Sequence, residues 1–135
     1  MNEAREVFGR LLACFTEGRW QDLADLYADD VVVEWPMAHP PHPTTMTGRD
    51  GLVARTEVAS RRPFELSAHN VVVHETADPE VVIAEWDYRT RVTTTGHTFT
   101  SANIQVVRVR DGKIVATRDY HDFQALAQIP APSEP

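Results

Sequence analysis

The dipeptide Asp111-Gly112 lies between two runs of alternating, β-rich sequence, at 103–110 and 113–123. Asp-Gly in this setting predicts a β-hairpin with a type I′ turn, because that turn needs positive φ angles at both central residues. The turn fixes how the two strands pair, and the pairing decides which side chains share a face. Much of the expected fold follows from this hairpin.

Alternation along the hairpin gathers polar residues on one face of the predicted sheet. On the second strand this face holds Val115, Thr117, Asp119 and His121, and the opposite face holds Ile114, Ala116, Arg118 and Tyr120. On the first strand it holds Ser101, Asn103, Gln105 and Val107. With the polar rows together, Asp119, His121, Asn103 and Gln105 form a polar cluster on an otherwise apolar sheet, which is typical of a pocket wall.

The composition indicates a single globular domain that does not bind nucleic acid. A chain of 135 residues fits one domain, which we assign to 1–128, and the Pro-rich segment 129–135 is predicted to be a disordered tail. The net charge is −7, and Arg61-Arg62 is the only basic cluster in the sequence. Phosphate backbones are bound by clustered Lys and Arg, so nucleic acid is not an expected partner.

The sequence also predicts a cytoplasmic protein that neither binds membranes nor needs a metal or cofactor. Its apolar runs are too short to span a bilayer, and its first residues do not form a signal peptide. The single cysteine, Cys14, excludes an internal disulfide and a multi-cysteine metal site. His39-Pro-Pro-His42 offers two imidazoles without a third ligand at a fixed spacing, so we expect this loop to close a cavity mouth instead.

Helices are predicted in the first half of the chain and strands in the second. Apolar residues at helical spacing predict a helix over 3–17, with Asn2 as its N-cap and Gly18 after its end. A short helix from Trp20 is expected to break near Asp29-Asp30, and a third helix covers 48–62. Strands are expected at 31–35, 64–75, 80–93, 98–110 and 113–123, and a stiff proline-rich loop at 37–46.

This order is the α+β pattern. We predict a cone-shaped α+β barrel, in which a strongly curved antiparallel sheet wraps around three helices and leaves a cavity beneath the first. The face of the sheet that the helices do not cover keeps apolar residues, among them Val106 and Ile114. An apolar face of this kind usually marks an interface, so we expect a homodimer that forms through the sheet.

Four motifs in this order resemble the nuclear transport factor 2-like superfamily, and within it the SnoaL-like polyketide cyclase family. They are Tyr27-Ala-Asp-Asp, Gly48-Arg-Asp, Asp111-Gly-Lys-Ile and Arg118-Asp-Tyr-His-Asp, and the resemblance covers about residues 3 to 127. It implies the curved, cystatin-like fold and a homodimer. It does not imply one reaction, because this fold carries enzymes, binding proteins and oligomerisation modules.

Three chemistries of the superfamily can be compared with this chain. Ketosteroid isomerases need an acidic base and two oxyanion donors where this chain has Trp35, Leu11 and Gln105, so we predict that it does not catalyse that reaction. Epoxide hydrolases match at Asp119 but need an Asp–Arg pair where Asp87 and Glu85 are the nearest candidates. Their water-positioning residues fall on Val33 and Trp35. SnoaL-like cyclases use a last-strand Asp with a nearby His, which resembles Asp119 with His121 or His97.

We therefore predict Asp119 and His121 as catalytic residues, because burial of a carboxylate in an apolar pocket brings its pKa toward neutrality. The residues predicted to contact a hydrophobic small molecule are Leu11, Phe15, Val33, Trp35, Trp86, Asp87, Ser101, Asn103, Gln105 and Thr117. Trp86 and Asp87 lie on opposite faces of one strand, and the sequence does not decide which face points inward. The expected function is a cofactor-independent isomerase, cyclase or hydrolase acting on a carbonyl compound. The alternatives are a non-catalytic binder of an apolar ligand and a bare dimerisation module.

Overall fold

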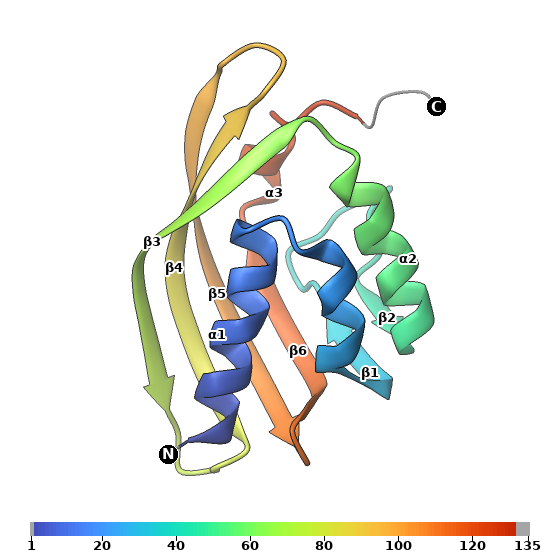
Figure 1. The fold of residues 1–135 in the computed structure, drawn as a ribbon, viewed down its shortest axis with the longest axis vertical. Helices are drawn as coiled ribbons and strands as arrows, with labels where there is room; N and C mark the ends of the chain where they lie inside the picture. The colour runs from blue at the N-terminus through green and yellow to red at the C-terminus, as the bar shows by residue number, and fades with distance from the viewer. Residues whose placement is uncertain (1, 132–135) are drawn as a thin grey trace.

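A computed structural model describes residues 2–131, whose strands form one curved six-stranded sheet with helices on its concave side (Figure 1). The strand order is β2-β1-β6-β5-β4-β3. The elements are α1 (Glu3–Thr16), η1 (Trp20–Leu26), β1 (Tyr27–Glu34), β2 (Thr45–Thr47), α2 (Arg49–Ser60), β3 (Phe64–Glu75), β4 (Val81–Val92), β5 (Thr98–Arg110), β6 (Lys113–His121) and α3 (Phe123–Leu126). The predicted α+β class is confirmed.

The first helix forms where the sequence predicts it and supplies one side of the core. The side chain of Asn2 accepts a hydrogen bond from the backbone N–H of Arg5 at 2.9 Å, which caps α1. The apolar face of α1 is buried against the concave face of the sheet, which it crosses in Figure 1. The buried residues of this face are Ala4, Val7, Phe8, Leu11 and Cys14.

The second predicted helix is shorter than expected. It is a 3₁₀ helix that ends at Leu26, and β1 already begins at Tyr27 rather than at Val31. Strand β1 runs parallel to β6, with Tyr27 opposite Ile114, whereas an antiparallel sheet is predicted from the sequence. The strand conformation is favoured over the helix at Tyr27 because pairing with β6 buries this residue in the core, where it is only 5% exposed.

The Asp111-Gly112 turn has the predicted geometry. The φ angles are 51° at Asp111 and 77° at Gly112, and β5 and β6 pair Gln105 with Asp119 and Asn103 with His121. The predicted polar face is therefore present. The face predicted for Ile114 was wrong. The pairing shifts beside Val109, so that Val115 is an extra residue in β6. Ile114 consequently turns inward and is fully buried, although simple alternation placed it on the outer face.

Strand β4 decides between the two faces that the sequence left open. Its even-numbered residues, including Trp86 and Tyr88, are buried on the concave side, and its odd-numbered residues point outward. Asp87 lies on the outer side, where its carboxylate accepts a hydrogen bond of 2.9 Å from Asn70 Nδ2. Asp87 therefore does not face the interior, and its prediction as a ligand contact was wrong.

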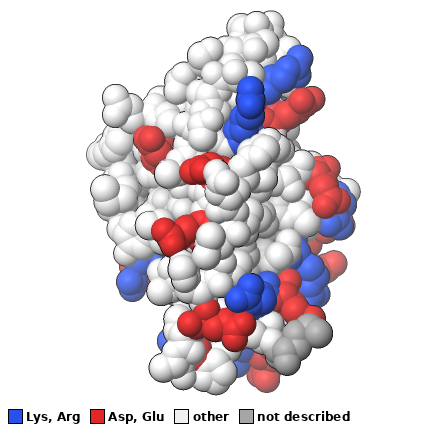
Figure 2. Space-filling view, turned by 90° about the vertical axis from the view of Figure 1, so that its left-hand side faces the viewer, with Lys and Arg blue, Asp and Glu red and all other residues white. Residues whose placement is uncertain are grey.

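The convex face of the sheet exposes several apolar residues. Val72 and Ile104 are 49% and 42% exposed, and both lie opposite Glu85 in adjacent strand pairs. Figure 2 shows the side of the molecule on which β3 lies. Most of this side is uncharged, and separate acidic and basic residues interrupt it. The homodimer through this sheet stays a prediction.

Within residues 2–131, no helix combines the length and the apolar character that a membrane crossing needs.

The C-terminal boundary differs from the prediction. Ile129 is only 5% exposed, and the Arg62 side chain donates hydrogen bonds to the carbonyls of Ile129 and Pro130 at 2.7 and 3.2 Å. The packed part of the chain thus extends beyond residue 128, because these backbone carbonyls find a partner on the segment after α2. The rest of the predicted tail, 132–135, lies outside the described residues.

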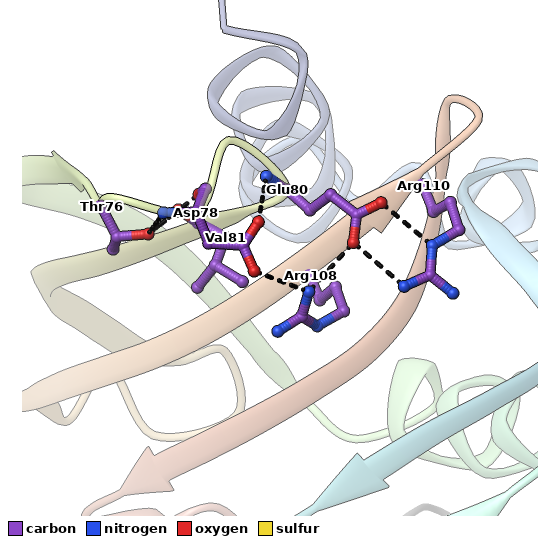
Figure 3. Close-up of polar contacts among 6 residues, drawn as sticks. All are labelled: Thr76, Asp78, Glu80, Val81, Arg108 and Arg110. Atoms are coloured by element: carbon purple, nitrogen blue, oxygen red, sulfur yellow. Dashed lines mark hydrogen bonds and ion pairs between the residues drawn. The ribbon is translucent and has the colours of Figure 1, made fainter.

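A cluster of charged side chains joins the start of β4 to the end of β5 (Figure 3). Arg110 donates two hydrogen bonds of 3.0 Å to the carboxylate of Glu80, and Arg108 donates to Glu80 at 2.9 Å and to Asp78 at 3.0 Å. These hydrogen bonds, first from Arg110 and then from Arg108, lower the pKa of Glu80 to about 2. The folded protein therefore stabilises the ionised form of Glu80.

We expect Glu80→Gln to lower the melting temperature at neutral pH, because it removes the charge from these hydrogen bonds. A carboxylate whose folded pKa lies below its unfolded value stabilises the fold above the unfolded value, and this stability is lost as the pH falls through the folded value. The difference in melting temperature between wild type and variant should thus shrink between pH 4.5 and about 2. Circular dichroism melts measure it. Glu57→Gln, at an exposed position of α2, is the control, and a Glu80 effect independent of pH contradicts the assignment.

Candidate functional site

A pocket of about 220 Å³ opens between the helices and the concave face of the sheet. Residues of α1, η1 and α2 form one side, and residues of β1, β3, β4, β5 and β6 form the other. The wall is mainly aromatic and aliphatic; it includes Phe8, Leu11, Phe15, Trp20, Val33, Trp35, Leu52, Phe64, Trp86 and Ile129. A cavity of roughly 150 Å³ with such a lining can hold a benzene ring, so this pocket has room for a compact cyclic molecule.

The polar part of the wall comes from the β5–β6 hairpin. Gln105 Nε2 donates a hydrogen bond of 2.6 Å to Asp119 Oδ1, and the other oxygen, Oδ2, lies 3.8 Å from His121 Nε2. His121 Nδ1 lies 2.9 Å from Asn103 Oδ1. All four side chains line the pocket, and Asp119 is only 7% exposed. The hairpin pairing brings them together because each polar residue faces another across the two strands.

The hydrogen bonds of Asn103 set the protonation of the histidine. Asn103 Nδ2 donates to the carbonyl of Ser101 at 3.1 Å, so Asn103 Oδ1 is the atom that faces the imidazole. An amide oxygen only accepts, and His121 Nδ1 must therefore carry the proton. In the neutral ring this leaves a lone pair on Nε2, directed at the carboxyl group of Asp119. The two atoms are 3.8 Å apart, which is longer than a hydrogen bond, so the lone pair of Nε2 stays available to a ligand or to a proton from Asp119.

Burial shifts both groups toward their neutral forms. It raises the pKa of Asp119, against the opposing effects of His121, Gln105 and Thr117. It lowers the pKa of His121, against the opposing effect of the Asp119 charge. A carboxylate held in this way gains from accepting a proton, which is the property that a general base needs near neutral pH.

Three further hydrogen-bond donors lie in the pocket wall, and the sequence analysis missed two of them. Tyr27 and Tyr88 both line the pocket. Burial and the charge of Asp119 raise the pKa of each phenol, in Tyr88 against the opposing effect of the neighbouring Trp86 side chain, so both keep their protons. The buried indole nitrogen of Trp86 has no hydrogen-bond partner among the described residues. Tyr88 shares a strand face with Trp86, so alternation was the signal that could have found it; Tyr27 was assigned to a helix.

The structure places the other predicted contacts in three groups. Five of them lie in the pocket wall, where the sequence places them: Leu11, Phe15, Val33, Trp35 and Trp86. Ser101 and Thr117 are buried on the same sheet face, at 2% and 4% exposure, but lie outside the lining. Asp87 is on the opposite face, as described above. His97 is bonded to Gln128 at 2.7 Å and does not line the pocket either, so His121 is the imidazole that accompanies Asp119.

The proline-rich loop packs against the segment that follows β6. The rings of His39 and His42 lie 6.2 and 5.5 Å from the ring of Phe123, which in turn lies 6.0 Å from the ring of His121. The loop is therefore connected to the polar end of the pocket through one aromatic side chain. Its two histidines are engaged in these ring contacts.

The sequence profile of the SnoaL-like domain matches residues 8–117, which is most of the chain. The chain belongs to the SnoaL-like family. The match includes α1 from Phe8 onward, the pocket-forming strands β1, β3, β4 and β5, and β6 as far as Thr117. The resemblance inferred from the four sequence motifs is thus confirmed.

Two curated relatives of this SnoaL-like protein match over most of their length. An uncharacterised PhzA/B-like protein of Pseudomonas aeruginosa is 30% identical over 119 residues, which are 87% of this chain and 82% of the relative. The uncharacterised protein YesE of Bacillus subtilis is 28% identical over 123 residues, which are 89% and 84% of the two chains.

Solved structures with the same fold carry several functional designations. A Bacillus subtilis protein with a provisional isomerase designation superposes with a TM-score of 0.82 and 28% identity, over 90% of each chain. A Pseudomonas putida protein with a provisional polyketide cyclase designation has a TM-score of 0.77 and 18% identity, over 94% and 98% of the chains. The Δ5-3-ketosteroid isomerase of a Mycobacterium species has a TM-score of 0.76 and 22% identity, over 93% and 97%. The last two show the fold alone.

Asp119→Asn should be more stable than wild type at alkaline pH, with a difference that grows as the pH rises. An acid with a raised folded pKa loses stability as the pH rises from its unfolded value, 3.8, through the folded one. The asparagine keeps an acceptor for Gln105 and gains a donor for His121 Nε2, without a buried charge. Melting temperatures at intervals from about pH 4 to about pH 8 measure the difference. Asp25→Asn, at an exposed position, serves as control, and a difference that falls with rising pH would show that Asp119 is not shifted upward.

Proposed function

We propose that this SnoaL-like protein is a cofactor-independent enzyme that transfers a proton next to the carbonyl group of a hydrophobic small molecule. The observation that supports this most is the Asp119–His121 pair, which is buried in the wall of an apolar pocket and separated by 3.8 Å. The substrate class follows from the lining, because an apolar wall with a few convergent polar groups favours a hydrophobic ligand with one polar function.

In the proposed reaction, ionised Asp119 takes a proton from the carbon beside the carbonyl. The electron pair of the broken C–H bond moves into the carbonyl group and gives an enolate. Asp119 becomes a neutral acid, which is the form that its buried position favours. It then returns the proton to another carbon, as in an isomerisation. In a cyclisation the enolate carbon instead attacks a second carbonyl, and the proton passes from Asp119, through His121 Nε2, to the alkoxide oxygen that this attack creates.

The enolate oxygen needs hydrogen-bond donors that are in place before the reaction. Tyr27 and Tyr88 are suited to this role because they line the same pocket and their phenols keep their protons. Trp86 adds an N–H group with no other partner among the described residues. These donors replace those that the sequence comparison with ketosteroid isomerases looked for at Leu11 and Gln105.

A second candidate function is the transport or storage of an apolar ligand without chemistry. It is favoured by the aromatic and aliphatic residues that make up most of the pocket wall. A computationally designed 17-OHP binder has the same fold, with a TM-score of 0.76 and 18% identity, over 92% of this chain and 96% of that one. Native mass spectrometry of the purified protein separates the two functions: a bound molecule that persists unchanged favours the carrier, and one that is converted favours the enzyme.

Asp119→Asn is expected to lower the rate of proton abstraction at least about 100-fold, which is the usual contribution of a positioned base. The assay needs no known product: cyclic ketones and 1,3-dicarbonyl compounds are incubated in D₂O, and deuterium incorporation next to the carbonyl is followed by proton NMR. Asp87→Asn is the matched control, because Asp87 is a carboxylate on the outer face of the same sheet. Equal exchange rates in wild type and Asp119→Asn would remove Asp119 from the mechanism.

A further inference from the structure

Helix α2 and the segment that follows it each contribute one arginine to the pocket wall. Arg55 and Arg62 both line the cavity and are half-buried, although neither was expected as a site residue. Arg55 lies on α2, and Arg62 lies two residues after the end of this helix. Burial lowers the pKa of both guanidinium groups, yet arginine stays charged in proteins, so two positive charges face the cavity.

Neither arginine has an ion-pair partner among residues 2–131, and in this they differ from most arginines of the chain. The arginines that do form ion pairs are Arg5, Arg19, Arg49, Arg91, Arg108, Arg110 and Arg118. The other cations without such a pair, for example Arg61 and Arg89, are exposed to solvent. In a chain with 20 acidic and 13 basic residues, half-buried arginines without a carboxylate are unexpected.

The two arginines differ in what occupies their N–H groups. Arg62 donates to the backbone carbonyls of Ile129 and Pro130, so it holds the C-terminal segment in the pocket wall. Arg55 makes no hydrogen bond within the described residues; its guanidinium carbon lies 4.9 Å from the centre of the Trp35 ring. Contact with an aromatic face holds a guanidinium while the N–H groups in its plane stay available. A planar group with free donors matches the geometry of a carboxylate.

We propose that the ligand of this pocket carries a carboxylate and that Arg55 binds it while Trp35 positions the guanidinium. The inference rests on the proposed function, because it names a second group on the same small molecule. The substrate class is then a compact cyclic carbonyl compound with a carboxylate substituent. Its ring lies against the aromatic wall, its carbonyl reaches Asp119, and its carboxylate reaches α2.

The test compares a charged probe, 2-naphthoate, with its neutral methyl ester, which is larger by one methyl group. Binding to the full-length protein is measured by quenching of tryptophan fluorescence and checked by isothermal titration calorimetry. The wild type should bind the acid at least about tenfold more tightly than the ester, which is the usual value of one charge-assisted hydrogen bond in a partly buried site.

Arg55→Met should abolish this preference by weakening the binding of the acid much more than that of the ester, because methionine removes the charge but keeps an apolar contact with Trp35. Arg55→Lys should retain part of the preference, and it covers the case in which the methionine variant does not fold. Arg61→Met is the matched control: it removes a neighbouring charge from the same segment at an exposed position and should keep the full preference.

Equal affinity of the wild type for both probes, or an unchanged preference in Arg55→Met, overturns the carboxylate assignment and leaves the proposed proton transfer standing. Failure of both probes to bind at millimolar concentration overturns both proposals, because the pocket would then not accept a compact ring. Tight binding of the acid that disappears in Arg61→Met as well as in Arg55→Met points to general attraction by the positive charges of this segment and contradicts a specific site.

Discussion

The hydrogen bond from Gln105 to Asp119 holds the polar side of this protein together. A carboxyl group that is 93% buried is costly unless its oxygens are satisfied, and this bond of 2.6 Å satisfies one of them while the other faces His121. The bond exists only in the observed pairing of β5 and β6. A slip of one residue would turn Asp119 to the convex face and His121 with it. The geometry of the pocket therefore depends on the two-residue turn some distance away.

The features that the sequence could predict are those set by local rules. The Asp-Gly turn and the alternation of β5 and β6 placed Asp119, His121, Asn103 and Gln105 on one face, because side-chain direction in a strand repeats every two residues. The helix α1 was predictable for a similar reason, since its apolar spacing and its N-cap are both short-range signals. These local signals were enough to locate the polar wall before any tertiary contact was known.

The features that were missed depend on contacts between distant segments. Tyr27 becomes part of a strand because β6 pairs with it, and Ile114 turns inward because of an irregularity in that same strand. The choice between Trp86 and Asp87 required knowing which side of β4 the helices cover. Arg55 lies on a helix with a weak apolar stripe, and only its packing on Trp35 places it beside the cavity. A short stretch of sequence contains no pattern that predicts these contacts, because most of them join segments that are far apart in the chain.

The extra residue Val115 divides β6 into two parts with different duties. Toward the turn, Ile114 packs in the hydrophobic core beside its partner Val109 of β5; beyond the irregularity, Thr117, Asp119 and His121 continue along the polar side of the hairpin. One strand thus contributes to the core at one end and to the polar wall of the pocket at the other. Because the core end is separate, the polar end can exchange residues during evolution without unravelling the hairpin, which is a physical route by which one scaffold can acquire many substrates.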